Sequence, residues 1–146
     1  GYHDTLIANG LTVHDDLIFP NTITQTSGEE AMRRILSMRQ PPDAIFSAGD
    51  FSALGAMLYA KEKQVNIPNQ IAISGFANEP FGSLVTPALT SVEQHGLEIG
   101  RQAVRLLIEE IEAAGKPFVP RTTTLKPQLI IRQSSQKTSY FLASNA

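Results

Sequence analysis

Two groups of residues with hydrogen-bonding side chains each come directly after an apolar run. Gly49–Asp50 follows the run Ala44–Phe46, and Ala77–Glu79 follows the run Ile71–Phe76. Carboxylates and an amide supply acceptors and donors together, which suits a molecule that carries hydroxyl groups. Neither group contains a nucleophile beside a base, so the chemistry that these residues indicate is binding.

Each of these side chains also has a structural interpretation. Asp50 can accept hydrogen bonds from a polyol, but an acidic residue at a helix start is more often explained by the exposed amides there. Asn78 and Glu79 fit an exposed binding loop and an ordinary polar turn equally well. Gln94 is open to the same two interpretations, and Phe81 fits either the core or a platform that stacks on a ligand.

The two apolar runs are typical of fully buried parallel strands, which are short and do not alternate. A helical pattern from Phe51 to Lys63 joins them, so the order is strand, helix, strand. We predict an α/β fold with a parallel sheet flanked by helices and right-handed crossovers. In such sheets ligands bind at the carboxyl ends of the strands, where both polar groups fall. The helix is expected to turn four residues inward: Ala53, Leu54, Met57 and Leu58.

The remaining elements follow from capping signals, periodicity and stop residues. Helices are predicted over Tyr2–Asn9, from Ser27 with a capping box to Glu30, and over Gly96–Ala114. Short strands are predicted at Leu17–Phe19, Leu89–Gln94, Arg121–Leu125 and Leu129–Ile131. The helix with the widest apolar stripe, the last one, is expected to pack on more than one side. From Ser134 onward the chain is expected to be a mobile polar tail, anchored at most by Tyr140, Phe141 and Leu142.

Composition limits the classes of protein that fit. The chain has 146 residues and a net charge of -2, which suits one domain or a large part of one. It has no basic run that would mark a nucleic-acid surface, and no apolar segment near the ~20 residues of a membrane span. The absence of cysteine excludes disulfides and thiolate metal sites and fits a reducing compartment. The first residues, Gly1–Asp4, match neither a signal peptide nor a natural start, so we expect a fragment.

The sequence contains no motif of the enzyme or cofactor-binding classes that we considered. There is no Gly-x-Ser-x-Gly elbow and no glycine-rich phosphate loop, so we expect neither an enzyme nor a bound cofactor. The three histidines are too far apart in the chain to suggest metal ligands. A phospho-receiver site built on Asp15-Asp16, Asp50, Thr90 and Lys116 also fails, because the acidic pair precedes its strand and the lysine follows a helix.

An ordered series of motifs runs through nearly the whole chain except its tail. It comprises Gly1-Tyr2, Ser27-Gly28, Pro42 to Asp50, Ala53 to Ala56, Ile67-Pro68, Ile71 to Phe76, Thr86 to Val92 with Gln94, Ile99-Gly100, and Leu125 to Ser134. Together these motifs resemble the lac-repressor/galactose-repressor family of bacterial transcription regulators. The resemblance implies a partial domain, the C-terminal lobe of an effector-binding core with the type I periplasmic-binding-protein-like fold. It also implies a first lobe and a helix-turn-helix domain upstream of this chain.

The resemblance further implies which residues face the effector. In the family one strand ends in Ala-Asn-Asp and presents its Asn, whereas this chain has Gly49 at that place and keeps Asp50. Another strand ends in Gly-Phe-Asp-Asp and presents its first Asp to sugar hydroxyls. This chain has Ala77 there, followed by Asn78 and Glu79. With two polar anchors replaced, either Asn78 and Glu79 hold the effector instead, or the effector has unusual chemistry.

Two more positions and the division of the chain follow from the same resemblance. Gln94 matches the family's glutamine at the crossing between lobes, and Ile23 falls near the place where an aromatic sugar platform is often found. Residues 1–94 would form the C-terminal lobe, 95–125 would cross to the other lobe, and 126–146 would hold the return strand and the tail. The helix Gly96–Ala114 would lack part of its packing surface without the first lobe, so we expect it to find a substitute on another copy of the chain or in a displaced position.

The function that the resemblance implies is that of a ligand-sensing part of a cytoplasmic transcription regulator. Its partners would be a small effector such as a sugar, a second copy in a homodimer, and operator DNA through the absent domain, with no membrane. The helix Asp50–Lys63 and the loop around Phe81 are the expected dimer faces. The alternative is a periplasmic sugar-binding protein of a transport system, which has the same fold. An enzyme is a distant third interpretation.

Overall fold

The computed structural model describes residues 1–20, 22–113 and 119–138. Its helices are α1 (Tyr2–Ala8), α2 (Gln25–Leu36), α3 (Asp50–Glu62) and α4 (Gly96–Glu112). Its strands are β1 (Ala44–Phe46), β2 (Ala72–Ser74), β3 (Ser91–Glu93) and β4 (Gln128–Ile130). Short 3-10 turns lie at η1 (Asp15–Leu17), η2 (Pro80–Ser83) and η3 (Gln133–Ser135). The predicted tail anchor at Tyr140, Phe141 and Leu142 lies outside the described residues.

The sheet that organises the molecule is parallel, as predicted. β1 pairs with β2 in parallel register, with Ala44 opposite Ala72. A parallel bridge from Ser74 to Thr90 extends the pairing to the next segment of the chain. β3 then pairs with β4 in antiparallel register, with Val92 opposite Leu129. The α/β class, with a parallel sheet flanked by helices, is therefore confirmed.

Helices α2 and α3 approach each other closely at two glycines. A Cβ on Gly28 would lie 1.8 Å from the Ser52 carbonyl oxygen, and one on Gly55 would lie 1.8 Å from the carbonyl oxygen of Gln25. Any side chain at either position would therefore force the helix backbones apart. This close packing positions the start of α3, and with it Asp50, against the end of β1.

The core is formed by apolar side chains of α2, α3, β2 and the segment before β3. Met32, Ile73 and Leu89 are fully buried, and each side chain of this size contributes roughly 1.5–3 kcal/mol by burial. Ala53 and Met57 of α3 are buried as predicted, whereas Leu58 is 47% exposed, so its predicted inward orientation is wrong. The inner face of α3 is instead lined by small residues, which lets α2 pack close to it.

Helix α2 begins earlier than its predicted start at Ser27. Thr24 is the N-cap, and its side-chain oxygen accepts a hydrogen bond from the Ser27 amide at 3.1 Å. The Thr24 amide donates in return to the Ser27 hydroxyl at 3.2 Å, so a capping box joins these two residues. Ser27 therefore occupies the third helical position of the motif, and the predicted reciprocal contact with Glu30 is wrong.

Strand β1 differs from the fully buried strand that the sequence predicts. Phe46 is 58% exposed, because only one edge of β1 is paired and the described chain does not cover the whole strand. Ile18, in the predicted strand Leu17–Phe19, has extended backbone, but that segment pairs with no strand among the described residues. That predicted strand is therefore wrong, since extended backbone becomes a strand only with a hydrogen-bonded neighbour.

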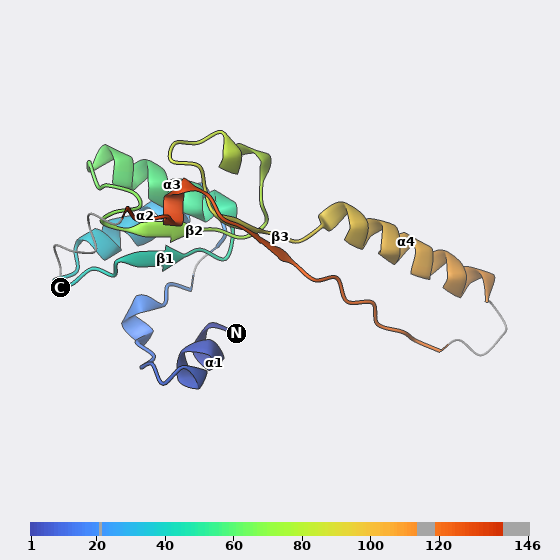
Figure 1. The fold of residues 1–146 in the computed structure, drawn as a ribbon. Coiled ribbons are helices and arrows are strands. Elements are labelled where there is room, and N and C mark those ends of the chain that lie inside the picture. Colours follow the sequence, from blue (N-terminus) through green and yellow to red (C-terminus); the bar gives the residue numbers. More distant parts are fainter. Residues whose placement is uncertain (21, 114–118, 139–146) are drawn as a thin grey trace.

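Helix α4 projects away from the rest of the molecule (Figure 1). It begins just after β3, and an extended segment leads from beyond the helix back to β4, which pairs with β3. None of its residues is buried, and Leu97, Leu107 and Ile111 are exposed. The prediction that this helix packs on more than one side is wrong for the described residues. The predicted strand Arg121–Leu125 is also absent, because no neighbouring segment pairs with it.

The chain after β4 returns to the core, which corrects the prediction that it is mobile from Ser134. Ser134 is fully buried in η3, and its hydroxyl donates to the Ile73 carbonyl at 2.6 Å. The same hydroxyl accepts from the Thr90 amide at 2.8 Å. One serine thus joins β2 to the segment before β3, a contact that a polar sequence does not reveal. No helix of the described chain has the length and apolar character needed to cross a membrane.

Candidate functional site

The two polar groups singled out in the sequence lie together at the carboxyl edge of the parallel sheet. The Asp50 amide donates to the Phe76 carbonyl at 3.1 Å, and the Glu79 amide donates to the Asp50 carboxylate at 2.7 Å. The ends of β1 and β2 are therefore joined directly. Parallel pairing requires this arrangement, because both strands end at the same edge.

Asp50 is the buried centre of this edge. It is 1% exposed, and its carboxylate accepts one hydrogen bond from the Ser91 hydroxyl and one from the Glu79 amide, each at 2.7 Å. It stands in the first turn of α3, where a negative charge is favoured, and Gly49 is the N-cap. Both carboxylate oxygens are thus engaged by the protein. These contacts fit a carboxylate that fixes the neighbouring loop.

The loop Ala77–Glu79 has an unusual backbone. Ala77 has φ 124° and Asn78 has φ 54°, so two consecutive non-glycine residues adopt positive φ. Asparagine tolerates this region well, whereas alanine does not, and such residues cost about 1–3 kcal/mol each. The amides of this loop donate to the Val92 carbonyl at 3.1 Å, to the Ser91 hydroxyl at 3.0 Å and to Asp50. These three hydrogen bonds hold the strained conformation.

Both ends of the Asn78 side-chain amide are hydrogen-bonded within the protein. Its amide nitrogen donates to Glu93 at 2.9 Å, and its carbonyl oxygen accepts from the Arg132 guanidinium at 2.8 Å. Arg132 donates in addition to the Leu89 carbonyl at 2.7 Å. Asn78 thus lies between a cation and an anion that come from either side of the β3–β4 pair. No sequence motif places Arg132 or Glu93 in this network.

Glu93 ends β3 and contacts the start of α4. Its carboxylate accepts from the His95 amide at 2.6 Å, and His95 is the N-cap of α4 with φ 57°. The hydrogen bond from Asn78, followed by the one from the His95 backbone, lowers the pKa of Glu93 below its ordinary value of 4.5. The carboxylate is therefore the form that this network stabilises.

Ile23 and Gly49 meet at the same edge. A Cβ on Gly49 would lie 2.1 Å from a methyl carbon of Ile23, so Ile23 covers the space beside Gly49. Ile23 is 56% exposed and presents an apolar surface to solvent. Ile23 therefore covers the buried Gly49 and is the apolar side chain that solvent meets at this place, whereas Ala77 is half-buried in the neighbouring loop.

Glu79 and Gln94 are the polar candidates whose side chains are not engaged by the described residues. Both are half-buried, and among the described residues no hydrogen bond is donated to or by the polar head of either side chain. Phe81 lies two residues beyond Glu79 and packs on Phe51, with ring centroids 5.1 Å apart. Phe51 is 47% exposed, so this aromatic pair forms part of the surface next to the edge.

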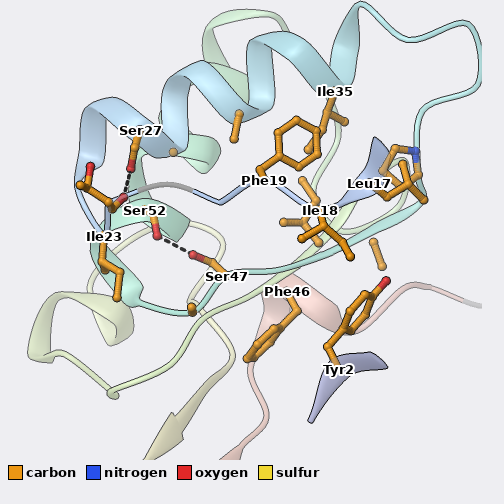
Figure 2. A pocket seen from close by; sticks show the side chains of 17 residues that line it. Tyr2, Leu17, Ile18, Phe19, Ile23, Ser27, Ile35, Phe46, Ser47 and Ser52 are labelled. Carbon is orange, nitrogen blue, oxygen red and sulfur yellow. Dashed lines mark hydrogen bonds between the residues drawn. The ribbon is translucent and has the colours of Figure 1, made fainter. Parts of the chain in front are cut away.

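A cavity of about 350 Å³ lies along the free edge of β1, between α2 and the segment Leu17–Phe19 (Figure 2). Tyr2 and Phe46 lie on one side of it, and Ile23 lines it near the carboxyl edge of the sheet. Its serine hydroxyls contact the protein, for example Ser47 and Ser52 at 2.6 Å from each other. The lining is mainly apolar and excludes Asp50, Asn78 and Glu79, so this cavity does not suit a hydroxylated ligand.

Metal chemistry has no visible basis in the described part of the chain. No group of three or more histidine, aspartate and glutamate side chains there is arranged to hold an ion. The buried polar side-chain atoms of the described residues all have hydrogen-bond partners.

The described residues thus form part of an α/β domain with hydrogen-bonding groups gathered at the carboxyl edge of a parallel sheet, which is the edge where such folds bind ligands. The family model described as "Periplasmic binding protein-like domain" matches residues 1–135, and the chain belongs to that family. The predicted resemblance to the lac-repressor/galactose-repressor regulators is confirmed by the relatives that follow.

The transcriptional repressor CytR of Escherichia coli (strain K12) is 33% identical over 136 residues, which cover 93% of this chain and 39% of CytR. The structure of a LacI-family transcriptional regulator from Sanguibacter keddieii DSM 10542 has a TM-score of 0.84 and 40% identity, covering 91% of this chain and 49% of that one. The structure of the regulator CelR in complex with cellobiose has a TM-score of 0.83 and 29% identity, covering 92% of this chain and 40% of that one. The chain therefore spans less than half the length of these relatives.

Proposed function

We propose that this chain is the ligand-sensing part of a cytoplasmic, homodimeric transcription regulator. It contributes one wall of a cleft in which a sugar or a related small hydroxylated molecule binds without being transformed. DNA binding belongs to a part of the regulator outside this chain. The proposal is supported by the family and by relatives that are transcription regulators, one of them solved with cellobiose. Since the relatives above are regulators, they favour this function over a transport protein or an enzyme.

The observation that carries the proposal is the joining of the two polar loops at one edge of the sheet by the Asp50–Glu79 hydrogen bond. Glu79 and Gln94 are the side chains that we assign to the effector hydroxyls, because the described protein leaves their polar heads unengaged. Asp50 and Asn78 act indirectly by fixing the loop that carries Glu79. We also assign Ile23, which is exposed and covers Gly49, as apolar surface against which a sugar ring packs, and the half-buried Ala77 as a further position at this edge.

We also propose a division of the regulator, based on the family resemblance. Residues 1–94 belong to the C-terminal lobe, residues 95–125 cross to the other lobe, and residues 126–146 return. The exposed apolar residues of α4 then have a partner surface on that other lobe. Effector binding changes the angle between the lobes and thereby the spacing of the DNA-binding heads in a homodimer. The face of α3 and the loop around Phe81 are the proposed dimer contacts.

Calorimetric titration of the full gene product with a panel of mono- and disaccharides and nucleosides tests this function. We expect one compound to bind with saturation and to be recovered unchanged. Recovery of a chemically altered compound would contradict the proposal, as would a complete absence of binding across the panel.

A further inference from the structure

The polar network around Asn78 connects three parts of the chain that are far apart in sequence. Asn78 follows β2, Glu93 ends β3, and Arg132 follows β4. Asn78 accepts from the Arg132 guanidinium at 2.8 Å and donates to the Glu93 carboxylate at 2.9 Å. An asparagine matches both neighbours, because it offers an oxygen to the cation and an N–H group to the anion.

The network ends at the two segments that leave the body of the molecule. Glu93 also accepts from the His95 amide at 2.6 Å, and His95 begins α4. Arg132 is held by its backbone amide, which donates to the Thr90 hydroxyl at 2.8 Å, and by its contact with Leu89. The base of the β3–β4 pair is therefore hydrogen-bonded to the loop Ala77–Glu79 from both sides.

The backbone of the loop is also strained, so its position depends on the contacts that hold it. Ala77 and Asn78 have positive φ, a conformation that persists only where surrounding contacts hold it. Backbone hydrogen bonds hold the loop to β3, but only the Asn78 side chain joins it to Arg132. Without that side chain, the strained loop would retain no hydrogen bond to the β4 side in the described chain.

We propose that Asn78 is a positioning residue that locks the loop Ala77–Glu79 to the base of both crossing segments through Glu93 and Arg132. The loop and the start of α4 then move as one rigid unit. A movement of Glu79 is thereby converted into a change in the direction of α4. The proposal rests on the proposed function only in naming Glu79 as the effector contact.

Spin-label distance measurements on the chain test this rigidity without any effector. The sequence contains no cysteine, so the pair Lys61→Cys and Glu110→Cys places one label on exposed α3 surface and one on exposed α4 surface. In the labelled parent the width of the distance distribution reports how firmly α4 is held. Asn78→Ala and Glu93→Ala are each expected to broaden this distribution.

The matched control is Asn69→Ala. The Asn69 side chain accepts two hydrogen bonds from Thr138, at 3.1 and 3.0 Å. Neither residue is hydrogen-bonded to Asn78, Glu93 or Arg132 in the described chain. This variant removes an asparagine with real contacts but is expected to leave the distribution unchanged. A purely structural role of Asn78 would lower the stability of the chain without broadening the distribution.

Hydrogen exchange provides the second measurement, which applies if Asn78→Ala folds poorly. Arg132→Met is expected to speed hydrogen exchange of the Asn78 and Glu79 amides about tenfold, because a tenfold change corresponds to about the free energy of one hydrogen bond. In the double variant Arg132→Met with Glu93→Ala, the exchange rate should rise by less than the product of the two single increases, because both residues act through Asn78. Unchanged distance widths in Asn78→Ala and Glu93→Ala, or fully multiplicative exchange effects, would overturn the proposal.

Discussion

Replacement of Asp50 by alanine removes the carboxylate that joins the ends of β1 and β2. Asp50 is 1% exposed and accepts from the Ser91 hydroxyl and the Glu79 amide, each at 2.7 Å. A hydrogen bond to a charged group contributes about 1.5–3 kcal/mol, and a buried donor left without a partner costs about 1–3 kcal/mol. Removal of the buried charge offsets part of this loss. We therefore expect Asp50→Ala to lower the free energy of unfolding by about 3 kcal/mol.

Asp50→Asn separates charge and geometry. The side-chain amide keeps one acceptor oxygen but places an N–H group against either the Glu79 amide or the Ser91 hydroxyl. The oxygen can still accept from the Glu79 amide while the N–H group donates to the Ser91 hydroxyl, because a hydroxyl accepts as well as donates. Both hydrogen bonds then lose their charge assistance, roughly 1 kcal/mol each, so we expect a decrease of about 2 kcal/mol in the free energy of unfolding. The control is Asp43→Asn, because Asp43 is 86% exposed and pairs with Lys137 at 2.9 Å. An exposed pair of this kind contributes about 0–1 kcal/mol.

Urea unfolding monitored by circular dichroism measures these differences. With a slope typical of small proteins, a loss of about 3 kcal/mol moves the midpoint by roughly 1–3 M urea, and the slope itself should stay constant. The reasoning is refuted if Asp50→Ala unfolds within 1 kcal/mol of the parent, about the effect of Asp43→Asn. That result would mean that the loop is held without the carboxylate.

Three further predictions follow from other residues. Ala77→Gly is expected to raise the free energy of unfolding by about 1 kcal/mol, because glycine relieves the φ of 124°, and a lower urea midpoint would contradict this. Met32→Ala, at a fully buried position, should lower the free energy of unfolding by about 2–5 kcal/mol. Leu107→Ala, at an exposed position of α4, should change it by less than about 0.5 kcal/mol, and equal losses in the two variants would refute the assignment of the core. The pKa of Glu93 is lowered on folding, so its contribution is present above pH 4.5 and is lost as the pH falls below that value. Glu93→Gln should therefore lose less stability than the parent in acid-unfolding titrations below pH 4.5, and superimposable curves would speak against the network.

The sequence was sufficient to predict the sheet and the edge at which the polar loops meet. Both strands are short apolar runs joined by a helical pattern, and that order alone requires parallel pairing with both carboxyl ends at one edge. The sequence was not sufficient for segments whose structure depends on a pairing or packing partner. Leu17–Phe19 has the composition of a strand but pairs with nothing in the described chain, and the apolar residues of α4 remain exposed for the same reason.

The hydrogen-bond partners within the site could not be predicted from one sequence either. Asn78 and Glu79 have similar polarity and adjacent positions, yet one side chain is engaged by Glu93 and Arg132 and the other is not. The partners lie 15 and 54 residues away along the chain, and only tertiary packing brings them together. Ser134 illustrates the same limit, since a serine in a polar segment is fully buried between two backbone groups.

The affinity of the Glu79→Ala variant for the effector found in the calorimetric panel tests the central assignment most directly. Loss of a hydrogen bond between the Glu79 carboxylate and a ligand hydroxyl should weaken binding about 10- to 100-fold, while Glu62→Ala, at an exposed glutamate paired with Lys63, should leave the affinity unchanged. Equal dissociation constants for the parent, Glu79→Ala and Glu62→Ala would contradict the assignment of the effector to this edge of the sheet.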